Sequence, residues 1–193
     1  MDKKEIFIGL VEGSITDLVI PSDVKSIGDY AFYYDDTLQN VVISNGVETI
    51  GNYAFSECDA MVDVSVPNSV KSIGSNAFYR CGVTNLTLAE GLQHIDESAF
   101  VQSGLTSIVI PSTVSYIGNC LFGNSLGLNS IILTTITFKQ PNGMEITLGS
   151  DLFKTKTAQA LTVYTDNETI KNYDYVADNV TPTFYHLDGT LWE

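Results

Sequence analysis

The stretch that decides the fold is MVDVSVPNSVKSIGSNAFYRC, residues 61–81. It begins with apolar residues at alternate positions, continues through a proline to an Ile-Gly pair, and then reaches Ala-Phe and a cysteine. The same order of features recurs before and after it along most of the chain. A motif that returns at a short, nearly constant period is typical of a solenoid, in which each unit forms one coil.

The phenylalanines of the motif fix its period. They are Phe32, Phe55, Phe78, Phe100 and Phe122, at spacings of 23, 23, 22 and 22 residues. An isoleucine stands five residues before each of them, and glycine follows that isoleucine in every unit but one, where Asp96 takes its place. Glycine, and less readily Asp, tolerates positive φ, so we expect left-handed backbone along this row.

An extended segment precedes each Ile-Gly pair. Its apolar and polar residues alternate, which predicts a β-strand with one buried face. The inward sets are Ile15/Leu18/Ile20, Leu38/Val41/Ile43, Met61/Val64/Val66, Val83/Leu86/Leu88, Leu105/Ile108/Ile110 and Leu128/Ile131/Leu133. Because one coil cannot cover its own apolar side, we expect stacked coils to bury these sets as a continuous core, at about 4.8 Å per coil.

These residues resemble the BspA-type leucine-rich repeat, whose unit reads approximately L-x-x-I-x-I-P-x-x-V-x-x-I-G-x-x-A-F-x-x-C. The resemblance covers about residues 15–133 and is strongest over residues 64–81. It implies a β-rich, right-handed leucine-rich repeat solenoid. The expected parallel sheet has about six to seven rungs, each from a repeat of 22–23 residues, and a small C-terminal cap. It also implies an exported or surface-displayed bacterial protein that acts in adhesion or host-protein binding.

The repeat and its breakdown divide the chain into four segments. We expect an N-terminal cap segment over 1–14, the repeats over 15–133, a degenerate repeat with a hairpin insertion over 134–164, and a C-terminal cap over 165–193. The hairpin is expected because residues 136–138 and 144–146 flank a Pro-Asn-Gly turn. Residues 161–164 are expected to form the last strand. The tail, residues 184–192, has a hairpin pattern that either caps the array or begins a connection to a further module.

The composition limits the classes of partner. The chain has 9 Lys and Arg against 23 Asp and Glu, a net charge of −14, which argues against nucleic acid and anionic membrane surfaces. No apolar stretch approaches the roughly 18 residues of a membrane span, so we expect no membrane insertion. The apolar run at 6–11 is too short for a signal peptide, so an exported protein would carry its signal outside this chain.

The reactive side chains do not form a catalytic pattern. There are two histidines, His94 and His186, in different parts of the chain, and no phosphate-binding glycine loop or HExxH motif. We therefore expect no enzyme activity, no catalytic residue, no cofactor and no metal site. Cys58 and Cys81 each follow a motif phenylalanine by three residues, and stacked side chains orient poorly for a disulfide, so buried free thiols are expected.

The outward positions of the predicted strands form the main candidate binding surface. No aromatic residue stands in these rows, which extend to Asn129, Ser130 and Ile132, so a glycan is a weaker candidate than a protein. A parallel sheet that binds nothing would have the same composition. The candidate residues are Asp17, Val19, Asn40, Val42, Asp63, Ser65, Asn85, Thr87, Ser107 and Val109.

Aromatic side chains elsewhere form secondary candidates. His94 and Tyr116 are expected to be stacked neighbours on adjacent coils, whereas Tyr33, Tyr34 and Tyr79 lie near the phenylalanine turns, where tyrosines could form a patch on the opposite side. The leading hypothesis is a non-catalytic, monomeric, extracellular or cell-surface module that binds a host or matrix protein. The alternatives are a structural spacer within a larger surface protein and, more weakly, an intracellular assembly scaffold.

Overall fold

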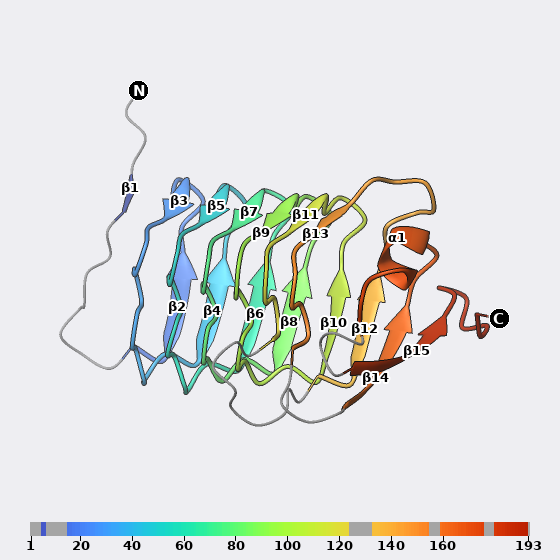
Figure 1. Ribbon diagram of the computed structural model, residues 1–193. Helices are drawn as coiled ribbons and strands as arrows, with labels where there is room; N and C mark the ends of the chain where they lie inside the picture. The colour runs from blue at the N-terminus through green and yellow to red at the C-terminus, as the bar shows by residue number, and fades with distance from the viewer. Residues whose placement is uncertain (1–4, 7–14, 124–132, 155–158, 176–179, 193) are drawn as a thin grey trace.

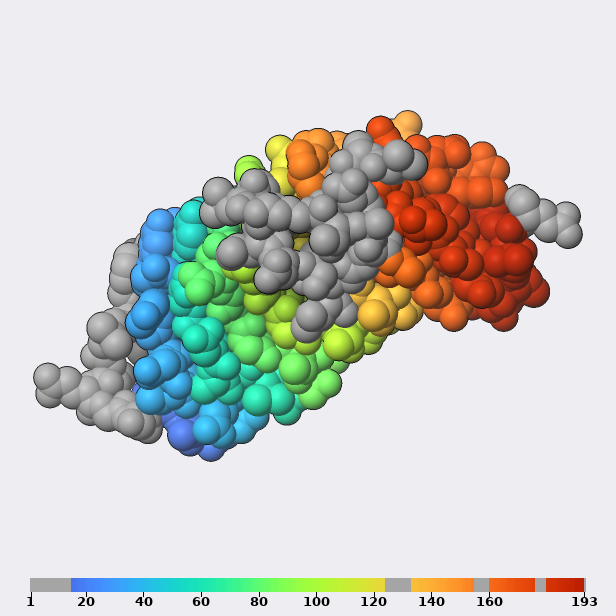
Figure 2. Space-filling view, turned by 60° about the horizontal axis from the view of Figure 1, so that its bottom comes forward, coloured from blue at the N-terminus to red at the C-terminus, as the bar shows by residue number. Residues whose placement is uncertain are grey.

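The chain winds into an elongated solenoid of about seven coils, each of which adds a strand to a long-strand layer and a strand to a short-strand layer (Figure 1). The computed structural model describes residues 5–6, 15–123, 133–154, 159–175 and 180–192. Successive coils lie side by side, from the N-terminal coils in blue to the C-terminal coils in red (Figure 2). The predicted leucine-rich repeat solenoid is confirmed.

The longer strand of each coil lies in one of two four-stranded parallel sheets, in the orders β2-β4-β6-β8 and β10-β12-β14-β15. The two sheets meet where β8 and β10 lie next to each other (Figure 1). We call their solvent side the long-strand face. The strands are β2 (Asp17–Ile20), β4 (Asn40–Ile43), β6 (Asp63–Val66), β8 (Asn85–Leu88), β10 (Ser107–Ile110), β12 (Thr135–Phe138), β14 (Gln159–Tyr164) and β15 (Val180–Tyr185).

The shorter strands form a seven-stranded parallel sheet that runs unbroken along the solenoid. The described residues contain one helix, the single turn α1 (Glu168–Lys171) near the C-terminal end. The short strands are β1 (Glu5–Ile6), β3 (Ser26–Ile27), β5 (Thr49–Ile50), β7 (Ser72–Ile73), β9 (His94–Ile95), β11 (Tyr116–Ile117) and β13 (Thr147–Leu148).

The remaining side of each coil, from the Ile-Gly pair to the next long strand, carries the phenylalanine, and we call it the turn side. Here alternate backbone N–H groups donate to the following coil, as those of Phe32 and Phe55 do to the carbonyls of Ala54 and Ala77 over 2.8 Å. Positive φ recurs two residues before and two residues after the phenylalanine. In the first five coils these residues, with φ of 49–65°, are Tyr30, Tyr34, Tyr53, Glu57, Asn76, Arg80, Ser98, Gln102 and Cys120.

The glycine row has a different role from the one expected. Among the described glycines, positive φ is found at Gly46, Gly143 and Gly189, none of which follows the motif isoleucine, so the expectation is wrong. A Cβ on Gly51 would lie 2.7 Å from the backbone nitrogen of Asp29 in the preceding coil, closer than real Cβ atoms come. Glycine is therefore favoured here because successive coils approach closely.

The core is a column of stacked rings. Phe55, Phe78 and Phe100 are at most 1% exposed. The ring centroids are 5.1 Å apart between Phe32 and Phe55, 5.4 Å between Phe55 and Phe78, and 5.8 Å at each later step to Phe153. Offset stacked rings at this spacing attract each other beyond their burial, so the column ties each coil to the next.

The irregular part of the array differs from the prediction at 134–164. Residues 136–138, expected in a hairpin insertion, belong to β12, which pairs in parallel with β10 from Ser107↔Thr135 to Ile110↔Phe138. Ile136 and Phe138 are buried, because their alternation fits the core side of a long strand. Most of the additional residues of this coil therefore precede its long strand, because β12 starts 28 residues after β10, whereas three lie between β12 and β13, whose starts are 12 residues apart instead of 9. The strand expected around Leu128 and Ile131 falls outside the described residues.

The C-terminal segment adds one more long strand and then folds back. β15 pairs with β14 in parallel over its whole length. The chain then reverses, and Leu191 bridges Tyr185 in antiparallel orientation. The indole of Trp192 stacks on His186 at 4.2 Å, and its Nε1 donates to the carbonyl oxygen of Thr165 over 2.8 Å. These contacts hold the tail against the final coil, as a cap would.

Cys58 and Cys81 are buried thiols outside any disulfide, as predicted. The Sγ atoms of Cys58 and Cys81 lie 3.0 Å from the carbonyl oxygens of Phe32 and Phe78, and each thiol donates to its carbonyl. Burial raises the pKa of both thiols to about 12. The thiols are therefore protonated, unreactive parts of the core.

We predict that Phe78→Ala lowers the free energy of unfolding by about 3–5 kcal/mol, because it removes a ring with stacked partners on both sides and leaves a cavity. Phe32→Ala is the matched control. Phe32 is only partly buried, so its loss should cost clearly less. Denaturant unfolding of both variants measures the difference, and equal costs would contradict the stacked column.

We predict that Gly51→Ala lowers the free energy of unfolding by about 1–3 kcal/mol, because the added methyl group overpacks the gap between coils. Gly28→Ala should be nearly neutral, since a Cβ at that position meets no atom within 4 Å. Asp96 shows that a coil can adjust to a Cβ in this row, so we expect a folded Gly51 variant. Thermal unfolding compares the two, and equal midpoints would contradict the close-approach explanation.

We predict that the protein loses stability as the pH rises from about 9 towards 12. In this range unfolded cysteines ionise while Cys58 and Cys81 in the folded chain keep their protons. The stabilisation from the raised folded pKa is therefore complete below about pH 9 and is lost progressively up to about pH 12, at a slope of at most about 1.4 kcal/mol per pH unit for each thiol. The variant Cys58→Ala/Cys81→Ala should show a shallower decline, and an unchanged slope would refute the assignment.

Candidate functional site

The long-strand face presents the predicted candidate residues in two straight rows. Pairing of β2, β4, β6 and β8 aligns Asp17, Asn40, Asp63 and Asn85 in one row. The same pairing aligns Val19, Val42, Ser65 and Thr87 in the next. Ser107 and Val109 occupy the equivalent positions of β10, and all ten candidates are exposed. The structure therefore brings the ten residues onto one surface.

Hydrogen bonds between neighbouring strands hold the first row in pairs. Nδ2 of Asn40 donates to Oδ1 of Asp17 over 2.6 Å, and Nδ2 of Asn85 donates to Oδ1 of Asp63 over the same distance. Each carboxylate is thus matched by an amide of the following coil. Because each bond restrains two exposed side chains, the row is partly preorganised before any partner binds.

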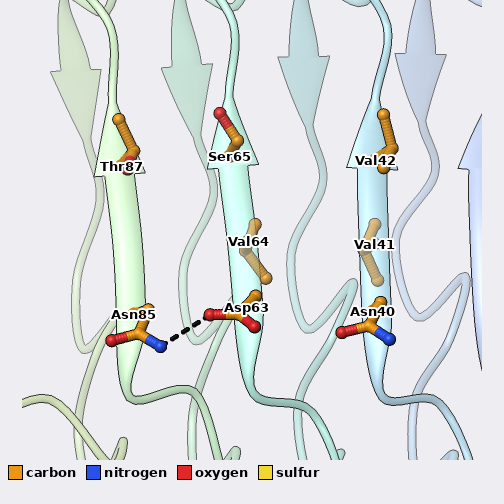
Figure 3. Close-up of a pocket in the computed structure, with 8 residues that line it drawn as sticks. All are labelled: Asn40, Val41, Val42, Asp63, Val64, Ser65, Asn85 and Thr87. Atoms are coloured by element: carbon orange, nitrogen blue, oxygen red, sulfur yellow. Dashed lines mark hydrogen bonds between the residues drawn. The ribbon is translucent and has the colours of Figure 1, made fainter.

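A shallow, solvent-open depression of about 250 Å³ lies in the middle of this face, across β4, β6 and β8. Figure 3 shows the Asn85–Asp63 pair on one side and Asn40, whose amide bonds to Asp17, on the other. The volume is below the range of typical small-molecule pockets, so the depression suits one or two side chains of a larger partner. Its lining residues are Asn40, Val41, Val42, Asp63, Val64, Ser65, Asn85 and Thr87.

The face continues beyond the predicted residues and becomes aromatic. The register of β10, β12, β14 and β15 extends the second row through Val109 and Thr137 to Tyr164 and Tyr185. The two tyrosine rings stack with centroids 5.3 Å apart. The expectation that these rows lack aromatic residues is therefore wrong. The expected continuation through Asn129, Ser130 and Ile132 lies outside the described residues.

The strand that carries Tyr164 was identifiable from the sequence, but its place in the row was not. Alternation along residues 161–164 puts Tyr164 on the outward side once the strand pairs with β12. That pairing was hidden because residues 136–138 had been interpreted as a hairpin arm. Tyr185 was not placed in the row because residues 184–192 were interpreted as a tail hairpin, whereas Tyr185 is the last residue of β15. β15 contains Pro182, which is tolerated because the strand lies at the end of its sheet order.

The secondary candidates divide between two sides of the solenoid. His94 and Tyr116 pair across β9 and β11 and stack at 5.1 Å, as predicted. The other candidates lie on the turn side. Tyr79 is half-buried there, and Tyr33 and Tyr34 are 45% and 67% exposed.

A compact group of rings, which we call the turn-side tyrosine cluster, consists of Tyr30, Tyr33, Tyr34 and Tyr53. The rings of Tyr30 and Tyr53 are almost parallel, with centroids 4.9 Å apart. Tyr33 meets Tyr30 edge-on at 5.7 Å, and Tyr34 lies 6.0 Å from Tyr33. The cluster joins residues of the first two coils, and its ring contacts among the described residues do not include Tyr79.

The long-strand face is nearly neutral although the chain is acidic. Among the ten predicted face residues only Asp17 and Asp63 carry charge, and both accept an amide hydrogen bond. In the part of the chain that the structure describes, no group of three or more His, Cys, Asp or Glu side chains could hold a metal ion. Over the same residues no helix is long and apolar enough to cross a membrane.

Known structures with similar coils come from bacteria. The pneumococcal vaccine antigen PcpA is 15% identical with a TM-score of 0.52, over 79% of this chain and 57% of that one. A leucine rich cell surface protein from Faecalibacterium prausnitzii is 19% identical with a TM-score of 0.47, over 88% of this chain and 57% of its own. The chain thus spans less than two thirds of either protein, and at 15% identity the likeness to PcpA shows the fold alone.

The comparison by sequence gives the family. No curated protein matches the chain. The sequence profile described as BspA type Leucine rich repeat region matches in six copies over residues 25–142, more than half of the 193 residues. These copies span the phenylalanine column from Phe32 to Phe122 and the long-strand face from β4 to β12. The chain belongs to the BspA-type leucine-rich repeat family.

Proposed function

We propose that this chain is a non-catalytic binding module, secreted or displayed at the cell surface, which holds a protein partner against its long-strand face. The observation that carries the proposal is the depression across β4, β6 and β8, bordered by hydrogen-bonded Asp and Asn side chains. It lies among the residues that the repeat pattern places outward, and its floor is a rigid parallel sheet.

The chemistry of this face favours a polypeptide over other ligands. Exposed Val19, Val42 and Val109 offer small apolar contacts, while the amides and hydroxyls beside them can both donate and accept hydrogen bonds. Such a mixture suits a protein surface, because neutral interfaces combine apolar contact with about one hydrogen bond per 100–200 Å². With little charge on the face, recognition depends on shape and hydrogen bonding.

The proposed location rests on the family. The resemblance to BspA-type repeats implies export, and a binding module without a catalytic cluster is most useful where it meets other proteins. An attachment role fits a repetitive array, because many weak contacts along one rigid surface add up. Absence of an upstream signal peptide in the intact gene would argue against this location and for an intracellular scaffold.

The test is the variant Asn40→Ala/Asp63→Ala/Asn85→Ala, assayed for binding to immobilised matrix proteins and to host cells. We expect at least about a tenfold loss of affinity, since the substitutions remove central hydrogen-bonding groups from the face. Lys71→Ala/Gln93→Ala, on the edge beside the short strands, is the matched control and should bind normally.

The salt dependence of the same binding provides a second readout. A partner held by a neutral face should lose little affinity as ionic strength rises, because few ion pairs are screened. Unchanged adhesion by the folded triple variant would remove binding from this face and leave the structural spacer as the better account.

A further inference from the structure

The turn-side tyrosine cluster uses a backbone conformation that its residues disfavour. Tyr30, Tyr34 and Tyr53 have φ of 58°, 65° and 55°. At the equivalent position before the phenylalanine, two later coils carry Asn76 and Ser98. Positive φ is uncommon for any side chain and an outlier for bulky ones, whereas Asn adopts it several-fold more often. The fold therefore requires the conformation but not the tyrosines.

Burial does not explain these tyrosines either. The exposed fractions of Tyr30, Tyr33 and Tyr34 are 56%, 45% and 67%, although a ring that supported the core would be covered. Positive φ recurs at the equivalent positions of later coils, such as Asn76 and Ser98, so the conformation belongs to the fold. What distinguishes the first two coils is that they place exposed aromatic rings there, which neither the backbone nor the core requires, and an exposed apolar group of this kind indicates a binding surface.

The charges around the cluster indicate what it binds. Residues 15–59, which form the first two coils, contain eight Asp and Glu but a single cation, Lys25. Lys25 is itself paired with Glu48, at 3.6 Å between Nζ and Oε1. The carboxylates next to the rings in sequence are Asp29, beside Tyr30, and Asp35 and Asp36, which directly follow Tyr34.

Two of these carboxylates are held in place. Oδ1 of Asp29 accepts from the backbone N–H of Asn52 over 2.7 Å, in the coil that carries Tyr53. Oδ1 of Asp35 accepts from the backbone N–H groups of Thr37 and Leu38 at 3.0 and 3.1 Å. Asp36 is exposed. Asp29 and Asp35 are therefore held in place next to Tyr30 and Tyr34 in the chain, and Asp36 adds an exposed charge beside them.

We propose that the turn-side tyrosine cluster is a second binding site, which takes the cationic side chains of a protein partner, and arginine in particular. A guanidinium group can lie flat on a tyrosine ring while its N–H groups pair with a carboxylate. A neutral glycan could donate hydroxyl hydrogen bonds to the carboxylates, but it would gain no charge attraction from them or from the ring faces. A guanidinium group gains both, and the exposed rings of Tyr33 and Tyr34 remain open to it beside the stacked pair of Tyr30 and Tyr53.

This site is independent of the long-strand face. It lies on another side of the coils and differs from the face in charge, so it would bind a different surface or a different partner. Its binding should weaken as salt rises, unlike that of the neutral face.

The test uses a labelled hexa-arginine peptide as the probe, with the hexa-citrulline peptide as its uncharged analogue. The protein variant is Tyr30→Asn/Tyr34→Asn, which removes two exposed rings and places a residue suited to positive φ at each position. We expect the variant to bind hexa-arginine roughly fivefold to thirtyfold more weakly, as the loss of two cation–π contacts predicts. Its thermal midpoint should be unchanged or raised, because the strain is relieved.

Two matched controls separate the site from general attraction to an acidic protein. Asp36→Asn and Glu145→Gln each remove one exposed negative charge, the first beside the cluster and the second in a distant coil. We expect only Asp36→Asn to weaken hexa-arginine binding several-fold, and the triple variant of the long-strand face to bind it almost as the wild type does. Equal losses for Asp36→Asn and Glu145→Gln would overturn the proposal. So would hexa-citrulline bound as tightly as hexa-arginine, or an oligosaccharide such as cellohexaose bound through the same tyrosines in its place.

Discussion

The constraint on which this structure depends is that every coil must lie directly above the one before it. Parallel hydrogen bonding fixes the distance between strands at about 4.8 Å, and the inward side chains must fill that layer without a gap. Stacked phenylalanines meet the requirement on the turn side, where their rings repeat at 5.1–5.8 Å. Glycine meets it where a Cβ would strike the backbone of the neighbouring coil.

The same stacking produces the surfaces. Because equivalent residues are aligned from coil to coil, similar residues at one outward position of successive coils form a row, and neighbouring rows form a face. On the long-strand face from β2 to β10 the aligned residues are small and mostly uncharged, and each Asp is joined to an Asn, as Asp63 is to Asn85. On the turn side of the first two coils they are tyrosines, held at backbone angles that later coils give to Asn76 and Ser98. One repeating core thus carries two surfaces of different chemistry.

Most of the fold was predictable from the sequence, because the spacing of apolar residues directly encodes the stacking. The strands from β2 to β11, the exposed candidate residues and the buried thiols follow from period and alternation alone. The role of the glycines was not predictable in this way. A glycine required for close approach looks the same in sequence as one required for positive φ, and the structure assigns the positive φ to neighbouring non-glycine residues. Residues 135–138 were not recognised as a long strand, because the residues around Leu128 and Ile131 show a similar apolar alternation and were expected to form the strand of that coil. Without this pairing, Tyr164 and Tyr185 could not be placed on the long-strand face.

The coils form one continuous core, although the long-strand layer is divided into two sheets between β8 and β10. The short-strand sheet is not divided there, and the phenylalanine column continues across the same junction. The most direct test follows denaturant unfolding of a Phe55→Ala variant by two signals. Far-UV circular dichroism reports the whole array, and the fluorescence of Trp192, the single tryptophan, reports its C-terminal end. With one continuous core, both signals change in one transition, and the substitution shifts that transition by the same amount in each signal. A tryptophan transition that stays at its wild-type midpoint would show that the C-terminal coils fold independently and would contradict a continuous core.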